Sequence, residues 1–154
     1  MANEDQTTQA AKNELLKVFI GKWHTTGEIV GSDAEVDAID TYEWLPGNYS
    51  IIHYADAGMG EDKFSSIEII GYVPSRGAFF CPFFDDQGGG GFEEADTEDG
   101  KVWHFHGENI MGVNFHRCTL TVSDDGNALE AIHEQSEDGT TWQPWMNVVL
   151  NRMS

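Results

Sequence analysis

The sequence predicts an all-β protein in which about ten antiparallel strands form an up-and-down β-barrel and one N-terminal α-helix closes a mouth of the barrel. Three observations lead to this prediction. Apolar residues recur with helical spacing only near the N-terminus. The rest of the chain consists of short runs in which polar and apolar residues alternate. Turn signals separate these runs at short intervals, which is typical of strands joined by hairpins.

One amphipathic helix is expected at the N-terminus. Its apolar positions lie three or four residues apart, at Ala11, Leu15, Val18 and Phe19. Gly21 comes next and is a typical residue at a helix end. We therefore expect a helix over residues 8–20 and a flexible segment over residues 1–7.

About ten strands are expected after Gly21. Turn signals, among them the glycine run at 88–91, divide the chain into short runs. The expected strands are centred near Thr25, Asp40, Ile51, Ile69, Phe80, Phe92, Phe105, Thr119, Ala131 and Val148. The intervals between them are too short for the crossovers that parallel strands need. An antiparallel meander of this size removes its exposed edges by closing, which gives a barrel with an interior cavity.

Composition and charge fit one domain over residues 1–154 and exclude several classes of partner. Hydrophobic residues make up 40% of the chain, which suffices for one core. The formal charge of -19 argues against nucleic acid and against anionic membrane surfaces as partners. The polar N-terminus does not resemble a secretory signal, and Cys81 and Cys118 are expected as buried free thiols. Together these features predict a cytoplasmic location.

Strand parity predicts which side chains point into the barrel, because successive side chains face opposite sides of a sheet. Acidic residues occupy alternate positions of several runs, and their neighbours are therefore expected inside. The chemically notable residues expected inside are Asp40, Tyr42, Trp44, His53, His116, His133, Trp142 and Met146. His104 and His106 share one face of their strand, and parity alone does not decide whether it is the inner face.

The favoured function is the binding of a small apolar or aromatic molecule in the barrel cavity. The expected ligand-binding residues combine aromatic area with polar groups, and they are Tyr42, Trp44, Phe79, Trp103, His104, His106 and Met146. The alternative is a non-covalent acid–base enzyme of the isomerase, cyclase or hydratase type. Its candidate catalytic residues are Asp40, His53, His116 and His133, because imidazoles titrate near neutral pH and a carboxylate can orient them.

A metal site and a cofactor are not expected. His104 and His106 are two residues apart, a spacing found in strand-based metal sites, but the sequence fixes no third ligand. Binding of haem or a metal through histidines is therefore a lesser alternative. The expected partner is a small hydrophobic or aromatic ligand, and a homodimer is a further candidate assembly.

Several motifs resemble those of a known kind of barrel. The similarity is carried by LLKVFIGKWHTTGEI, EWLPGNYSIIHY, IEIIGYVPSRGAFFCPFFDDQG and DGTTWQPWMNVVLNR, and it points to an uncharacterised bacterial family of lipocalin-like (calycin-type) barrels. The matching positions are Gly21, Trp23, Gly71, Tyr72, Asp138, Gly139, Trp142 and Arg152. The resemblance implies a lipocalin-like fold in which Trp23 and Arg152 pack together at the closed end, and it implies no activity.

A more distant resemblance is to nitrobindin-type haem barrels, which share the Gly-x-Trp opening. This sequence departs from them because no histidine follows Trp142, where those proteins have one near the C-terminus. His133 lies a strand earlier. The departure is the reason that haem is not expected.

Overall fold

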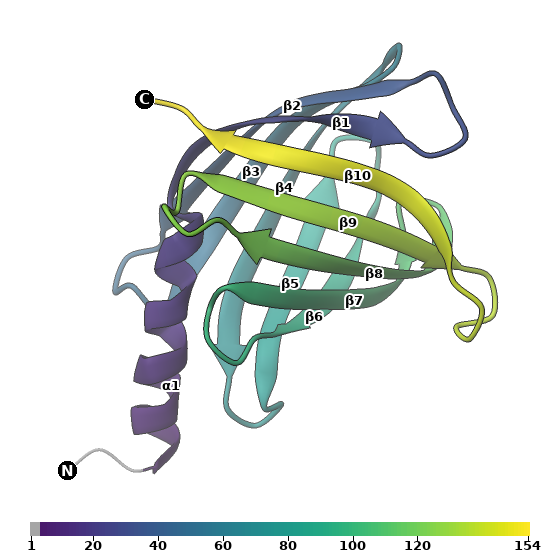
Figure 1. Cartoon of the computed structure of the whole chain (residues 1–154). Helices are drawn as coiled ribbons and strands as arrows, with labels where there is room; N and C mark the ends of the chain where they lie inside the picture. Colours follow the sequence, from purple (N-terminus) through teal and green to yellow (C-terminus); the bar gives the residue numbers. More distant parts are fainter. Residues whose placement is uncertain (1–3) are drawn as a thin grey trace.

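The computed structural model describes residues 4–154. Ten antiparallel strands form a closed barrel, in which each strand pairs with its neighbours in the sequence and β1 pairs with β10 (Figure 1). The strands are β1 (Gly21–Ile29), β2 (Glu35–Trp44), β3 (Ser50–Met59), β4 (Asp62–Val73), β5 (Ala78–Asp85), β6 (Gly90–Asp96), β7 (Val102–Ile110), β8 (Val113–Val122), β9 (Ala128–Ser136) and β10 (Gln143–Arg152). Every strand centre expected from the sequence lies inside one of these strands, so the predicted barrel is confirmed.

The pairing of β1 with β10 closes the barrel. A Cβ atom at Gly27 would lie 2.1 Å from the carbonyl oxygen of Asn147, so the two strands can approach this closely only at a glycine. Further along the same pair, Arg152 Cζ lies 4.1 Å from the ring centroid of Trp23, and Arg152 Nη1 donates to the carbonyl of Ile20. This contact is the Trp23–Arg152 packing that the family resemblance implies.

A helix and a 3-10 turn precede β1. The helix α1 covers Glu4–Leu15 and the 3-10 turn η1 covers Leu16–Phe19, so the helix predicted over 8–20 is wrong at both ends. Good helix formers in the stretch EDQTTQAAKNEL allow the earlier start, and the last turn tightens into 3-10 geometry. The helix begins inside the segment 1–7 that was expected to be flexible, and residues 1–3 lie outside the described residues.

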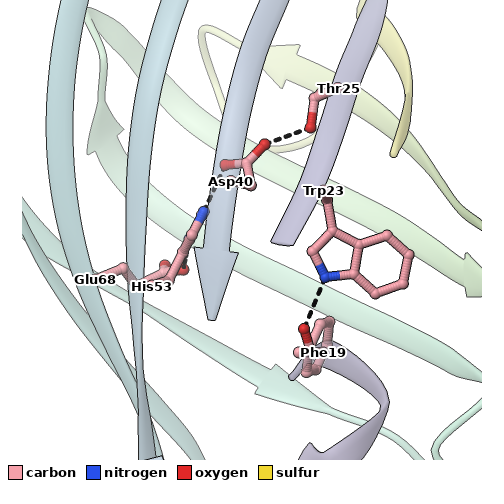
Figure 2. Close-up of polar contacts among 6 residues, drawn as sticks. All are labelled: Phe19, Trp23, Thr25, Asp40, His53 and Glu68. Carbon is pink, nitrogen blue, oxygen red and sulfur yellow. Dashed lines mark hydrogen bonds and ion pairs between the residues drawn. The ribbon is translucent and has the colours of Figure 1, made fainter. Parts of the chain in front are cut away.

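The mouth next to the N-terminus is filled by η1 more than by α1. Leu16 and Phe19 are fully buried, whereas most of α1, including Ala11, is exposed. The Phe19 ring lies 4.9 Å from the Trp103 ring, centroid to centroid. Trp23 Nε1 donates a hydrogen bond of 2.8 Å to the carbonyl of Phe19 (Figure 2). The N-terminal segment therefore closes a mouth as predicted, with the 3-10 turn as the apolar plug.

The two ends of the barrel differ in the elements that form them. Gln9 of α1 donates to the carbonyl of Tyr72 near the β4–β5 hairpin, and Lys12 donates to the carbonyl of Thr97 after β6. The helix therefore stands at the end that carries these two hairpins (Figure 1). The opposite end carries the β3–β4, β5–β6 and β7–β8 hairpins. Among residues 4–154, no helix is long and apolar enough to cross a membrane.

Candidate functional site

A cavity of about 650 Å³ occupies the interior of the barrel. Much of its wall is apolar and comes from inward-facing strand residues, such as Phe105, Leu120, Ala131, Met146, Val148 and Leu150. The lining continues to Asp62 and Lys63 at the β3–β4 hairpin and to Gln87 at the β5–β6 hairpin. The cavity therefore opens at the end opposite to α1, where the glycine run at 88–91 also lies.

Four polar side chains on neighbouring strands form a first group in this wall, the His53 cluster (Thr25, Asp40, His53 and Glu68). His53 Nε2 lies 2.6 Å from Asp40 Oδ1, and His53 Nδ1 lies 3.2 Å from Glu68 Oε1 (Figure 2). The Thr25 hydroxyl donates to the other oxygen of Asp40. Register explains the assembly, because His53 of β3 lies directly opposite Tyr42 of β2 and Glu68 of β4. The two carboxylates therefore engage both ring nitrogens of His53.

The surroundings of His53 keep its imidazole positively charged. Burial alone would lower its pKa, but the hydrogen bonds to Asp40 and Glu68 outweigh burial and raise the pKa to about 9. Burial likewise acts to raise the pKa of Asp40, yet the hydrogen bond from His53 and its charge hold that pKa below the ordinary value. The Tyr42 ring stacks on the imidazole at 4.1 Å between centroids. The cluster is thus a fixed cation between two acids.

The His133 cluster (Glu93, His116, Cys118 and His133) is the second polar group in the cavity wall. His116 Nδ1 donates to Glu93 Oε2 over 2.7 Å, and His116 Nε2 shares a hydrogen bond of 2.8 Å with His133 Nδ1. The other ring nitrogen of His133 lies 3.8 Å from the Cys118 sulfur. Trp145 stands edge-on to this pair of imidazoles, with 5.5 Å between its centroid and that of His116.

A glycine makes the contact between Glu93 and His116 possible. Gly107 of β7 lies opposite Glu93 of β6 on one side and opposite His116 of β8 on the other. Any Cβ atom at this position would lie 2.8 Å from Glu93 Cγ. Because Gly107 has no side chain, Glu93 can reach across the intervening strand to the imidazole.

The His133 cluster differs from the His53 cluster in its charge. Burial and the neighbouring His116 lower the pKa of His133 to about 3, so this imidazole is neutral at neutral pH. Burial raises the pKa of the Cys118 thiol far above its usual range, and Cys81 behaves in the same way. Both cysteines are buried free thiols, as predicted. At neutral pH the cavity therefore presents a charged imidazole at His53 and a neutral one at His133.

Six of the site residues predicted from the sequence line the cavity, and they are Asp40, Tyr42, His53, His116, His133 and Met146. The four candidate catalytic residues among them are hydrogen-bonded in pairs, Asp40 with His53 and His116 with His133. Parity correctly oriented these side chains because polar residues mark the outer face of their runs, as Ser50 and Asp56 do for the run that contains His53.

Three aromatic residues predicted to bind ligand do not line the cavity. Phe79 and Trp103 are fully buried against each other and against Phe19, because η1 fills that end of the barrel with side chains. Trp44 lies beside α1 in a surface pocket together with Asn13. All three residues stabilise the closed end of the barrel instead.

His104 and His106 point to solvent and do not line the cavity, contrary to the expectation that they contact a ligand there. They alternate along β7 with Trp103 and Phe105, which are buried, and the side chains between them must face outward. Among residues 4–154, no group of three or more His, Cys, Asp or Glu side chains is arranged to hold a metal ion.

A bulge in β10 determines which of two tryptophans faces the cavity. The register of β10 against β9 shifts between Pro144 and Met146, which reverses the parity before this point. Trp145 consequently lines the cavity, whereas Trp142 lies outside with Arg117 Cζ 4.2 Å from its ring centroid. The expected inward orientation of Trp142 is therefore wrong, and Trp145 is a cavity residue that parity missed.

Strand parity also did not identify Glu68 and Glu93 as residues that line the cavity. In β4, the apolar residues Ile67 and Ile69 would suggest an inner face of their own, but both are exposed and Glu68 points inward. No local signal reports this orientation, which follows from the register with His53. For Glu93 the sequence held a signal, because it shares a face with the apolar Ala95, while Glu94 and Asp96 share the other face.

The comparisons with known proteins give similarity in structure alone. A scan against protein-family models and a search of curated proteins found no match. Rv2717c from M. tuberculosis is similar in structure, with a TM-score of 0.66 and 15% identity over 92% of this chain and 96% of that one. The S-type phycobiliprotein lyase CPES from Guillardia theta has a TM-score of 0.62 and 8% identity, over 99% of both chains. A de novo designed fluorescence-activating β-barrel has a TM-score of 0.50 and 10% identity, over 89% of this chain and 95% of the design.

These likenesses show that the chain has a ten-stranded barrel fold similar to lipocalin-like barrels. The resemblance to one uncharacterised bacterial family, the more distant one to nitrobindins, the cytoplasmic location and the homodimer stay predictions.

Proposed function

We propose that this protein binds one small, largely apolar or aromatic molecule inside its barrel. The observation that carries the proposal is the cavity of about 650 Å³, whose apolar wall is interrupted by two hydrogen-bonded polar clusters. Small-molecule sites in proteins have this size and this combination of apolar area with a few polar groups. Barrels of similar fold include a phycobiliprotein lyase and a designed fluorescence-activating protein, which is consistent with a small-molecule ligand.

Structural need alone does not account for the polar clusters. A carboxylate taken out of water loses several kcal/mol of hydration unless partners replace it. An apolar interior would stabilise the barrel equally well, yet Asp40, Glu93 and His116 are all buried. Groups of this kind orient the polar end of a ligand, while the apolar wall supplies the contact area.

Acid–base catalysis, the alternative predicted from the sequence, has weaker support. Both ring nitrogens of His53 already contact carboxylates, so a reacting molecule would have to displace one of them. His133, with its pKa of about 3, is a poor base at neutral pH. Binding needs neither group to exchange a proton.

The test is the binding of the neutral fluorophore N-phenylnaphthylamine, whose emission rises in apolar surroundings. We expect saturable one-to-one binding by the wild-type protein and a loss of at least about tenfold in affinity for Ala131→Trp, because the new side chain projects into the cavity and takes up part of its volume. Ile132→Trp is the matched control, since Ile132 is the next residue and is exposed on the outer face. Equal binding by both variants would place the fluorophore outside the cavity and overturn the proposal.

A further inference from the structure

We propose that the cavity takes an organic cation: an aromatic or alkyl molecule whose ammonium group lies between Glu68 and Glu93. This inference rests on the proposed function and names the chemical class of its ligand.

Within the described part of the chain, each cluster leaves one carboxylate oxygen without a hydrogen-bond donor from the protein. Glu68 contacts His53 through Oε1, and Glu93 contacts His116 through Oε2. Among residues 4–154, no group donates a hydrogen bond to Glu68 Oε2 or to Glu93 Oε1. Every fully buried side-chain nitrogen or oxygen in this range has a hydrogen-bond partner, so these two oxygens are not fully buried. The two free oxygens therefore retain access to the cavity, which both side chains line. They can accept hydrogen bonds from the donors of a ligand.

The charge balance of the lining favours a positive ligand. Five carboxylates line the cavity, and they belong to Asp40, Asp62, Glu68, Asp85 and Glu93. The groups in the lining that can carry a positive charge against them are Lys63 and the imidazoles of His53 and His116. Even with all three counted as positive, the five carboxylates leave a formal excess of two negative charges (5 − 3) in the lining, in a protein whose formal charge is already -19. A carboxylate ligand would be repelled, and a cation would be attracted.

Glu68 of β4 and Glu93 of β6 point into the same cavity from the two strands that flank β5. Burial is the main cause that raises the pKa of Glu68, and the like charges of Glu93 and Asp40 add to it. The positive charge of His53 works in the opposite direction and does not cancel these effects. An ammonium group close to both carboxylates would relieve this repulsion and supply up to three N–H donors.

The cavity also offers apolar surface for the hydrocarbon part of the ligand. Trp145, Phe105 and Met146 line the same cavity and provide apolar and aromatic area for a flat hydrocarbon body. Lys63, the one lysine or arginine in the lining among the described residues, belongs to the first turn-proximal part of β4 at the open end, five residues before Glu68. The chemistry that fits is an amine joined to an aromatic or alkyl group.

Three naphthalene derivatives of nearly equal shape test the proposal by isothermal titration calorimetry at neutral pH. They are naphthylmethylammonium, naphthalenemethanol and naphthoate, substituted at the same ring position. We expect the ammonium compound to bind about tenfold or more tightly than the alcohol, and naphthoate to bind most weakly. Glu68→Gln and Glu93→Gln should each reduce the preference for the ammonium compound and leave the affinity for the alcohol nearly unchanged, which also shows that the variant is folded.

Glu94→Gln is the control, because Glu94 is adjacent in sequence but faces outward and pairs with Arg76. This variant should keep the full preference for the ammonium compound over the alcohol. If the alcohol or naphthoate binds as tightly as the ammonium compound, the ligand class is wrong while cavity binding stands. Should none of the three compounds bind and N-phenylnaphthylamine also fail to bind, the proposed function itself is wrong.

Discussion

At the scale of single residues, the state of His53 follows from its two neighbours. Asp40 and Glu68 accept from its two ring nitrogens, and Tyr42 covers one face of the ring. Opposite charges at hydrogen-bond distance overcome the cost of burying the imidazolium. The result is a charge whose loss should be visible in the stability of the whole protein.

The free energy of unfolding should fall as pH rises from about 6.5 to about 9. The folded pKa of His53 is raised above its unfolded value, so its contribution is complete below the unfolded pKa and is lost as pH passes the folded one. The loss is at most roughly 3 kcal/mol. Urea unfolding of the wild type and of His53→Gln across this range measures it, and the variant should show a shallower decline.

His104→Gln is the control for this measurement, because the His104 side chain is exposed. In this variant the free energy of unfolding should fall with pH as steeply as it does in the wild type. The pKa of His53 can also be read directly from the NMR shift of its ring proton, which needs no variant. A value close to that of a free imidazole, together with equal slopes for wild type and His53→Gln, would contradict this account.

Sequence parity could predict some of these residues and not others. Asp40 and His116 lie on runs with regular alternation, so their inward orientation could be read from the chain. Glu68 could not, because Ile67 and Ile69 beside it are apolar and yet exposed on the outside of β4. What places Glu68 inside is its register with His53 on another strand, which no local pattern contains.

At the scale of elements, the strands were predictable because short turns separate them and each run is long enough to alternate. The helix boundaries were less so, since the tightening of residues 16–19 into a 3-10 turn depends on packing inside the mouth. The bulge between Pro144 and Met146 is likewise a property of strand pairing. It moved Trp145 into the cavity and Trp142 out of it, against the pattern of the sequence.

Strand pairing also holds the His133 cluster together, and Gly107→Ala tests this. The added methyl group would lie 2.8 Å from Glu93 Cγ and 3.0 Å from the carbonyl oxygen of Phe92, which cannot move freely. We expect destabilisation by about 1–3 kcal/mol in urea unfolding. The hydrogen bond from His116 to Glu93 should be lost as well, which a downfield imidazole proton in the NMR spectrum reports.

Gly91→Ala serves as the comparison, because a Cβ there would meet the Phe83 ring at an ordinary 3.5 Å. Gly91→Ala should destabilise the protein clearly less than Gly107→Ala does, and it should keep the downfield signal of the His116 imidazole proton. An intact signal in Gly107→Ala would mean that Glu93 reaches His116 without the gap that the glycine leaves.

At the scale of the whole molecule, the barrel combines a plugged end with an open and acidic one. The plug of Leu16 and Phe19 fills one mouth, and the cavity opens between hairpins at the other. The strands supply the wall of the cavity, and polar side chains that point inward supply hydrogen bonds. Fold and cavity together support small-molecule binding, and the charge of the lining narrows the class of ligand.

The most direct test of the proposed binding is an NMR titration that follows the indole N–H signals of the tryptophans while N-phenylnaphthylamine is added. Trp145 lines the cavity, and Trp142, three residues earlier, lies outside under Arg117. Trp145→Phe and Trp142→Phe assign the two signals. The account predicts that the Trp145 signal shifts to saturation at one equivalent and that the Trp142 signal stays in place. A Trp145 signal that does not move, whatever the other tryptophans do, would contradict it.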